Sequence, residues 1–134
     1  MKFQYEDGAK VRRDVQGPKS DLLQDGVKAL DSDLADWVDG FVFGAVWGRD
    51  GLSQEDRTIV AISVLAASRN HDQLEAYLFG ALHKGVSARK IQEVLVMLTV
   101  YSGFPVAIQA LTVFRSVVTS VRSAGVDIDL DSIG

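Results

Sequence analysis

Polar side chains that could do chemistry recur at helical spacing between residues 70 and 77. Asn70, Gln73 and Tyr77 are three and four residues apart, so on a helix they line one face. Arg57 precedes a long apolar run and could reach the same space from a facing helix. Two amides, a neutral phenol and a fixed cation around an apolar cavity would suit a small anionic molecule.

Arg49 and Tyr101 would add a second cation and a second phenol to this cavity. A bland interpretation stays open beside this one. In it, both tyrosines are core aromatics with satisfied hydroxyl groups, and Arg57 pairs with a nearby carboxylate. The carboxylates within its reach would be Glu55, Asp56 and Glu93.

The residue inventory argues against metal, cofactor and thiol chemistry. The chain has no cysteine, and it shows neither a phosphate loop nor a dinucleotide fingerprint. Its two histidines, His71 and His83, are roughly 120° apart on a helix and cannot share a metal within one subunit. We therefore expect no cofactor and no metal site.

Composition indicates one small domain, residues 1–134, that binds copies of itself. Hydrophobic residues make up 47% and charged residues 24% of the chain, more apolar surface than a monomer this small can easily bury. The net charge of -4 argues against nucleic-acid and anionic-membrane partners. The missing cysteines, and a first decade without the apolar core of an export signal, favour a cytoplasmic protein.

Periodicity predicts an all-helical fold with few extended parts. We expect an extended, solvated arm over residues 1–20 and an exposed or partner-docked tail over 123–134. A helix from Asp21 to Leu30 precedes one capped by Ser32, whose apolar stripe we expect in the core. That stripe comprises Leu34, Trp37, Val38, Phe41, Val42, Ala45 and Val46.

Capping signals place the later helices. Ser53 to Asp56 has the form of a capping box, so a central helix should begin near Gln54 and be covered on every side over residues 59–67. Further helices are predicted over residues 71–84, after Ser87, and from Pro105. The apolar run 94–114 is interrupted by Gly103 and Pro105, so we interpret it as buried helix and not as a membrane span.

Several stretches of the chain resemble the carboxymuconolactone decarboxylase family, which includes the alkyl hydroperoxidase D proteins. The resemblance runs from Gly8 to about Val118. Its most specific parts are Trp47-Gly48-Arg49-Asp50-Gly51-Leu52, Asp56-Arg57-Thr58-Ile59-Val60, Gly80-Ala81-Leu82-His83-Lys84-Gly85-Val86, Ile91-Gln92-Glu93-Val94 and Tyr101-Ser102-Gly103-Phe104-Pro105-Val106-Ala107. The resemblance implies a compact bundle of about six helices that forms a symmetric homotrimer or homohexamer, with pockets near the subunit contacts.

The resemblance also locates the site. Where the hydroperoxidases have a cysteine pair followed by histidine, this chain has Asn70, Gln73 and Tyr77. The decarboxylase pattern Glu-Leu-x-x-His reads Gln73-Leu74-Glu75-Ala76-Tyr77, so a thiol peroxidase is not expected. By position, Arg49 or Arg57 would hold a carboxylate, Gln73 and Asn70 would stabilise enolate charge, and Tyr77 would deliver a proton.

Two hypotheses follow. The first is a cofactor-independent acid-base enzyme acting on a small carboxylated lactone, enol or related carbonyl compound. Its catalytic residues would be Tyr77, Arg57 and Gln73, with substrate contacts from Arg49, Asn70, Glu75, His83, Tyr101 and Trp47. The second is a non-catalytic oligomeric ligand-binding or scaffold protein. Glu75 and His83 discriminate between them, because either one beside Tyr77 would supply a general base.

Overall fold

The structure, a computed structural model, describes residues 5–134. Helices and connecting loops make up these residues, with no strand among them, which confirms the predicted all-α fold. The elements are α1 (Tyr5–Gln16), η1 (Gly17–Lys19), α2 (Ser20–Leu30), α3 (Ser32–Trp37), η2 (Val38–Val46), α4 (Gln54–Ala67), α5 (His71–Lys84), α6 (Ala88–Val96), α7 (Leu98–Tyr101), α8 (Phe104–Ser123) and η3 (Leu130–Ile133).

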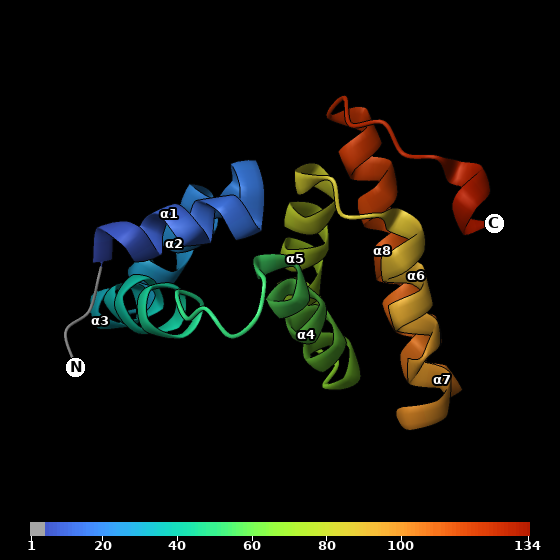
Figure 1. The fold of residues 1–134 in the computed structure, drawn as a ribbon, viewed down its shortest axis with the longest axis horizontal. Coiled ribbons are helices and arrows are strands. Elements are labelled where there is room, and N and C mark those ends of the chain that lie inside the picture. Colours follow the sequence, from blue (N-terminus) through green and yellow to red (C-terminus); the bar gives the residue numbers. More distant parts are fainter. Residues whose placement is uncertain (1–4) are drawn as a thin grey trace.

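The apolar core lies in the C-terminal half. Helix α5 packs between α4 and α8, and α6 lies along α8 (Figure 1). The fully buried side chains there include Ile62, Leu74, Leu78, Ile91 and Phe114. The predicted starts of α4, α5 and α6 are confirmed. The Ser53 hydroxyl accepts from the Asp56 amide, and the Ser87 hydroxyl accepts from the Lys90 amide.

The N-terminal segment is helical from Tyr5 to Lys19, so the extended arm predicted over residues 1–20 is wrong there; its residues 1–4 lie outside the described part of the chain. Helices α1, α2 and α3 form with η2 a layer beside α4 and α5 (Figure 1). The buried residues of α1 are Gly8, Arg12, Val15 and Gln16, at helical spacing. Two of these four are polar, so the segment has no apolar stripe to reveal it. Arg12 is therefore buried, and not in solvent as an extended arm would place it.

The stripe predicted for the core after residue 32 faces outward in the single chain. Leu34, Trp37, Phe41 and Val46 are exposed. Residues 38–46 form a π-helix, whose wider turn shifts the register that an α-helical stripe assumes. The buried residues are instead Ala35, Gly40 and Phe43; α3 packs against α2, and η2 packs against α1. The cap also differs by one position, because Asp31 and not Ser32 caps α3.

The central helix α4 is covered on one side only, which corrects the prediction of full burial. Ile62 and Ala66 are buried, whereas Val60 and Val64 are 54% and 60% exposed. Helices α5, α6 and α8 lie on the buried side, and none of the other helices in residues 5–134 covers Val60 and Val64. Apolar surface thus continues from η2 onto α4.

The C-terminal segments also differ from expectation. The apolar run 94–114 spans the end of α6, all of α7 and half of α8. By length and composition α8 could cross a membrane, but one of its faces, including Phe114 and Val121, is buried in the core. The tail, predicted to be exposed or docked on a partner, is exposed over most of its length, but its end folds back on its own chain. Ile133 is buried, and its carbonyl accepts a hydrogen bond from Arg115.

Candidate functional site

A cavity of ≈ 190 Å³ lies between the end of η2 and the start of α4. Trp47 directly follows η2, and the chain returns through Leu52 into the first turns of α4, which carry Arg57 and Val60. Its lining is apolar apart from Arg57: Val46, Trp47, Leu52, Arg57, Val60 and Ala61. A single cation on an apolar wall is the arrangement expected for a small anionic ligand with an apolar part.

Arg57 has a hydrogen-bond donor that no described residue satisfies. Its Nη2 donates to the backbone carbonyl of Arg49 at 2.9 Å, and its buried Nε has no hydrogen-bond partner. No carboxylate among residues 5–134 forms an ion pair with it, and Glu55 pairs with Lys90 at 3.2 Å. The alternative that Arg57 pairs with a neighbouring carboxylate is therefore wrong. An unpartnered buried donor on a cation is costly unless an anion completes it.

Tyr77 lies beside Trp47. The two rings stack with centroids 6.3 Å apart and an interplanar angle of 27°. Phe43 packs on the same Trp47 ring at 5.5 Å. Burial raises the pKa of Tyr77 above its ordinary value of 10.0, and a hydrogen bond with the Gln16 side chain opposes part of that rise. The phenol is thus protonated at neutral pH and suits a proton donor.

The predicted amide face is not part of this arrangement in the single chain. Asn70 and Gln73 are exposed, and the Asn70 amide donates to the Ser68 hydroxyl at 2.6 Å. The reason is the direction in which α5 packs, since it turns Leu74 and Leu78 into the core and leaves Gln73 in solvent. The Arg49 side chain is exposed as well. Its contact with Arg57 is through its backbone carbonyl, which accepts the Arg57 hydrogen bond.

Glu75 and His83 do not line the Arg57 cavity. Glu75 borders a separate hollow with Lys19 and Phe79. His83 stacks on Phe79 with ring centroids 6.3 Å apart. The Nζ atom of Lys19 lies 4.2 Å from the centroid of that same Phe79 ring. Neither predicted candidate therefore supplies a general base beside Trp47 and Arg57.

Tyr101 is 78% exposed on α7, and the single chain does not bring it to the cavity. The prediction assumed one continuous helix after Ser87. The structure breaks that helix at Met97, where α6 ends and α7 begins one residue later. Tyr101 then no longer shares the buried face of Ile91 and Leu95.

Gln16 is the site residue that sequence reasoning missed. It lies in the segment interpreted as an arm, yet its spacing from Gly8 and Arg12 is helical. Phe43, Leu52 and Val60 were likewise not predicted, because apolar residues carry no chemical signal of their own. Helical periodicity that includes polar residues could have identified the position of Gln16, but not its partner.

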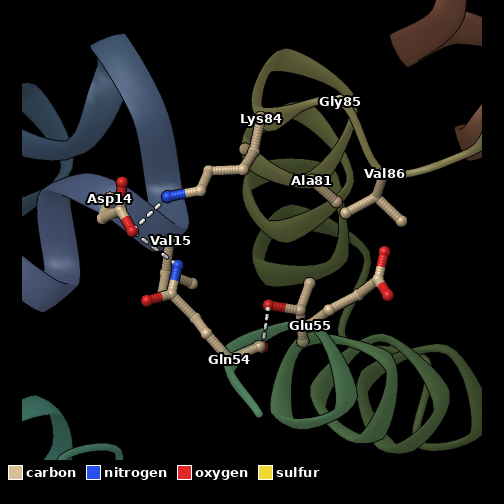
Figure 2. A pocket seen from close by; sticks show the side chains of 10 residues that line it. Asp14, Val15, Gln54, Glu55, Ala81, Lys84, Gly85 and Val86 are labelled. Atoms are coloured by element: carbon tan, nitrogen blue, oxygen red, sulfur yellow. Dashed lines mark hydrogen bonds and ion pairs between the residues drawn. The ribbon is translucent and has the colours of Figure 1, made fainter.

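A second cavity, of ≈ 160 Å³, lies where α1, α4 and α5 meet (Figure 2). Lys84 pairs with Asp14, and the Gln54 amide donates to the same carboxylate at 2.8 Å. The Lys84 hydrogen bond, followed by that of Gln54, lowers the pKa of Asp14. Because its charged groups pair within the chain, we interpret this cavity as a joint between the helices and not as a ligand site.

Comparison with known proteins identifies the family of this chain. Residues 32–116, which contain Trp47, Arg57 and Tyr77, match the carboxymuconolactone decarboxylase family. The 4-carboxymuconolactone decarboxylase of Acinetobacter baylyi is 29% identical over 108 residues, 80% of this chain and 81% of that protein. Nitrosuccinic acid decarboxylase npaB of Metarhizium robertsii is 24% identical over 124 residues, 90% of this chain and 85% of that protein.

Proposed function

The chain belongs to the carboxymuconolactone decarboxylase family, and we propose that it is a cofactor-independent decarboxylase of a small carboxylic acid. The observation that carries this proposal is the Arg57 guanidinium, whose buried Nε has no hydrogen-bond partner, in an apolar cavity whose Trp47 wall stacks on a protonated Tyr77. The names of two relatives support it, since both are decarboxylases.

The substrate class follows from the chemistry of losing carbon dioxide. Breaking the carbon–carboxylate bond leaves an electron pair that must be delocalised into a neighbouring acceptor. The names of the two relatives supply such acceptors, a lactone in one and a nitro group in the other. We propose a small acid whose carboxyl group lies next to a lactone, enol, carbonyl or comparable acceptor.

In the proposed reaction, Arg57 binds and orients the substrate anion, while the apolar wall of Trp47, Leu52 and Val60 excludes water around it. The carboxylate leaves as carbon dioxide, and its bonding electrons pass to the acceptor group. Tyr77 gives its proton to the carbon that carried the carboxylate, and solvent restores the phenol. Neither Glu75 nor His83 has a part in this scheme.

A second candidate function is a ligand-binding or scaffold subunit without catalysis. The observation in its favour is that neither Glu75 nor His83 lines the Arg57 cavity, so neither supplies a general base there. In this alternative, Arg57 and Trp47 would still bind a small anion. Binding without release of carbon dioxide would distinguish this function from the first.

The active species is proposed to be a symmetric homo-oligomer, a trimer or a hexamer. The support is the apolar surface that the single chain leaves uncovered on α3, η2 and α4. Trp37 on α3 is 55% exposed. Phe41 on η2 is exposed as well, and so are Val60 and Val64 on α4. Monomers rarely keep so many large apolar side chains in solvent.

The functional test compares Tyr77→Phe with the wild type. Carbon dioxide release is measured with 4-carboxymuconolactone and with nitrosuccinic acid as probes. Removing the phenolic proton should lower kcat by about 10²- to 10⁴-fold, while circular dichroism and mass stay unchanged. Tyr5→Phe, which alters an exposed tyrosine of α1, is the matched control and should keep full activity.

The outcomes separate the two functions. Full turnover by Tyr77→Phe would contradict the role of this residue. A wild-type chain that binds either acid without releasing carbon dioxide would favour the non-catalytic alternative. Arg57→Gln should weaken the binding of both probes, because Arg57 is the only charged side chain among the described residues that line the cavity.

A further inference from the structure

A chain of buried polar side chains runs through the N-terminal layer. Arg12, Gln16 and Ser20 are 3%, 8% and 1% exposed. The Nη1 atom of Arg12 donates to the Ser20 hydroxyl at 2.7 Å, and its Nε donates to Asp39 at 2.7 Å. The Ser20 hydroxyl donates in turn to the Oε1 atom of Gln16 at 3.0 Å. The direction of each bond in this chain follows from the chemistry of its members.

Arg12 sets that direction because a guanidinium can only donate. The Ser20 oxygen must therefore accept from it, which leaves the single hydroxyl proton of Ser20 for Gln16. If the Gln16 amide were turned over, Ser20 would receive two N–H donors and its own buried proton would lack an acceptor. The amide oxygen of Gln16 thus faces Ser20, and its NH₂ group faces away.

Gln16 reaches α5 because the backbones approach closely at Gly80. A Cβ atom on Gly80 would overlap the carbonyl oxygen of Val15 and lie 2.8 Å from the Cα atom of Gln16. Tyr77 precedes Gly80 by three residues and lies on the same face of α5. A side-chain hydrogen bond of Gln16 counts among the causes that set the pKa of Tyr77, and it lowers that pKa, which places the Gln16 amide within reach of the phenol.

We propose that Gln16 is a positioning residue for Tyr77, held by Arg12 and Ser20 so that its NH₂ group donates to the phenolic oxygen. The phenol then accepts from the protein, and its own proton is free for a ligand on the Trp47 side. The inference rests on the proposed function, in which Tyr77 gives up that proton. If Gln16 instead accepted the proton, the acid would be occupied before any substrate arrived.

The first experiment needs no substrate. Infrared spectra of protein with ring-labelled tyrosine are recorded at neutral pH, and the spectrum of Tyr77→Phe is subtracted to isolate Tyr77. A phenol that accepts has a lower C–O stretching frequency than one that donates. We expect the accepting signature in the wild type and its loss in Gln16→Leu. A donating signature in the wild type, or an unchanged signal in Gln16→Leu, would overturn the proposal.

Gln24→Leu is the matched control. Gln24 lies in the same N-terminal layer, and its amide donates to the Ala35 carbonyl at 2.8 Å instead of contacting Tyr77. It should cost similar stability and leave the Tyr77 signal unmoved. If Gln16→Leu does not fold, Ser20→Ala replaces it. This variant frees the amide of Gln16 to rotate, so the accepting signature should weaken; a signal identical to that of the wild type contradicts the proposal.

The second experiment is kinetic. Gln16→Leu should lower kcat about tenfold and leave KM nearly unchanged, since one hydrogen bond to the proton donor is lost and no ligand contact. Gln16→Glu keeps the length but can only accept as a carboxylate, so it should lower kcat at least as much. A rise in KM alone would overturn the positioning role. If the wild type turns over neither acid, the proposed function fails while the infrared result still tests the contact.

Discussion

The two halves of the molecule are stabilised by different kinds of interior. The C-terminal half surrounds a continuous apolar core whose buried members run from Ile62 to Ile133. The N-terminal layer has Val15, Ala35 and Phe43 buried, but its centre is Arg12 with hydrogen bonds to Ser20 and Asp39. One half therefore depends on burial of apolar area, and the other on a satisfied buried charge.

This difference has consequences for function. A buried polar network has fixed donors and acceptors, so the N-terminal layer can orient a side chain of the other half, as Gln16 does for Tyr77. An apolar core packs densely, but it has no hydrogen-bond donors or acceptors with which to orient a polar side chain. The N-terminal layer also keeps much of its apolar surface outside, where Trp37 and Phe41 are exposed.

The largest effects should come from removing the centre of each half. Phe114→Ala should lower the free energy of unfolding by about 3–5 kcal/mol through the cavity it leaves. Arg12→Met should cost about as much, roughly 3–5 kcal/mol, because Asp39 and Ser20 lose their buried donor. Urea unfolding gives the totals, and hydrogen exchange shows where protection is lost.

The location of the loss tests the comparison. Arg12→Met should release amides of α1 and η2 while α5 and α8 stay protected, and Phe114→Ala should release α5 and α8. Arg13→Met is the control for the loss of one positive charge, since Arg13 is exposed and pairs with the exposed carboxylate of Asp21. An Arg12→Met chain as stable as Arg13→Met would show that the buried network does not stabilise this layer.

An intermediate effect is expected at the apolar surface of the N-terminal layer. Trp37→Glu should leave the fold intact but weaken self-association by about 2 kcal/mol, roughly 30-fold in Kd, as for an aromatic residue central to an interface. Sedimentation measures the mass. Leu130→Glu, on η3 at the far end of the chain, is the control. A wild-type chain that stays monomeric at micromolar concentration would contradict the proposed oligomer.

The smallest effect concerns the ion pair that joins the halves, Asp14 with Lys84 (Figure 2). The Lys84 hydrogen bond lowers the pKa of Asp14 below 3.8, so the pair stabilises the fold above that pH and the contribution is lost as pH falls through the folded pKa. Because both side chains are half exposed, Lys84→Met should cost less than about 1 kcal/mol at neutral pH.

The difference in unfolding free energy between wild type and Lys84→Met should vanish at acid pH. Lys28→Met, an exposed lysine on α2, is the control and should show no such pH dependence. A difference that stays constant with pH would mean that Lys84 stabilises the joint by packing alone.

Sequence alone determined the family, the all-helical fold and the boundaries of the helices with strong local signals. The caps at Ser53 and Ser87 and the glycine end of α5 at Gly85 were predicted because each satisfies its own backbone within a few residues. Of the proposed site, Trp47, Arg57 and Tyr77 were named in advance by residue type, helical spacing and family resemblance.

Tertiary structure decided the remainder, because those features depend on contacts between distant residues. Gln16 acquires its role from a crossing of α1 with α5 at Gly80, and Arg12 from pairing with Asp39 on η2. Asn70 and Gln73 are exposed because of which face of α5 packs into the core. Tyr101 is exposed because α6 ends before it. Local sequence patterns indicate helix periodicity and the caps that hydrogen-bond the ends of a helix. The partner of a buried polar side chain is determined only when the helices pack together.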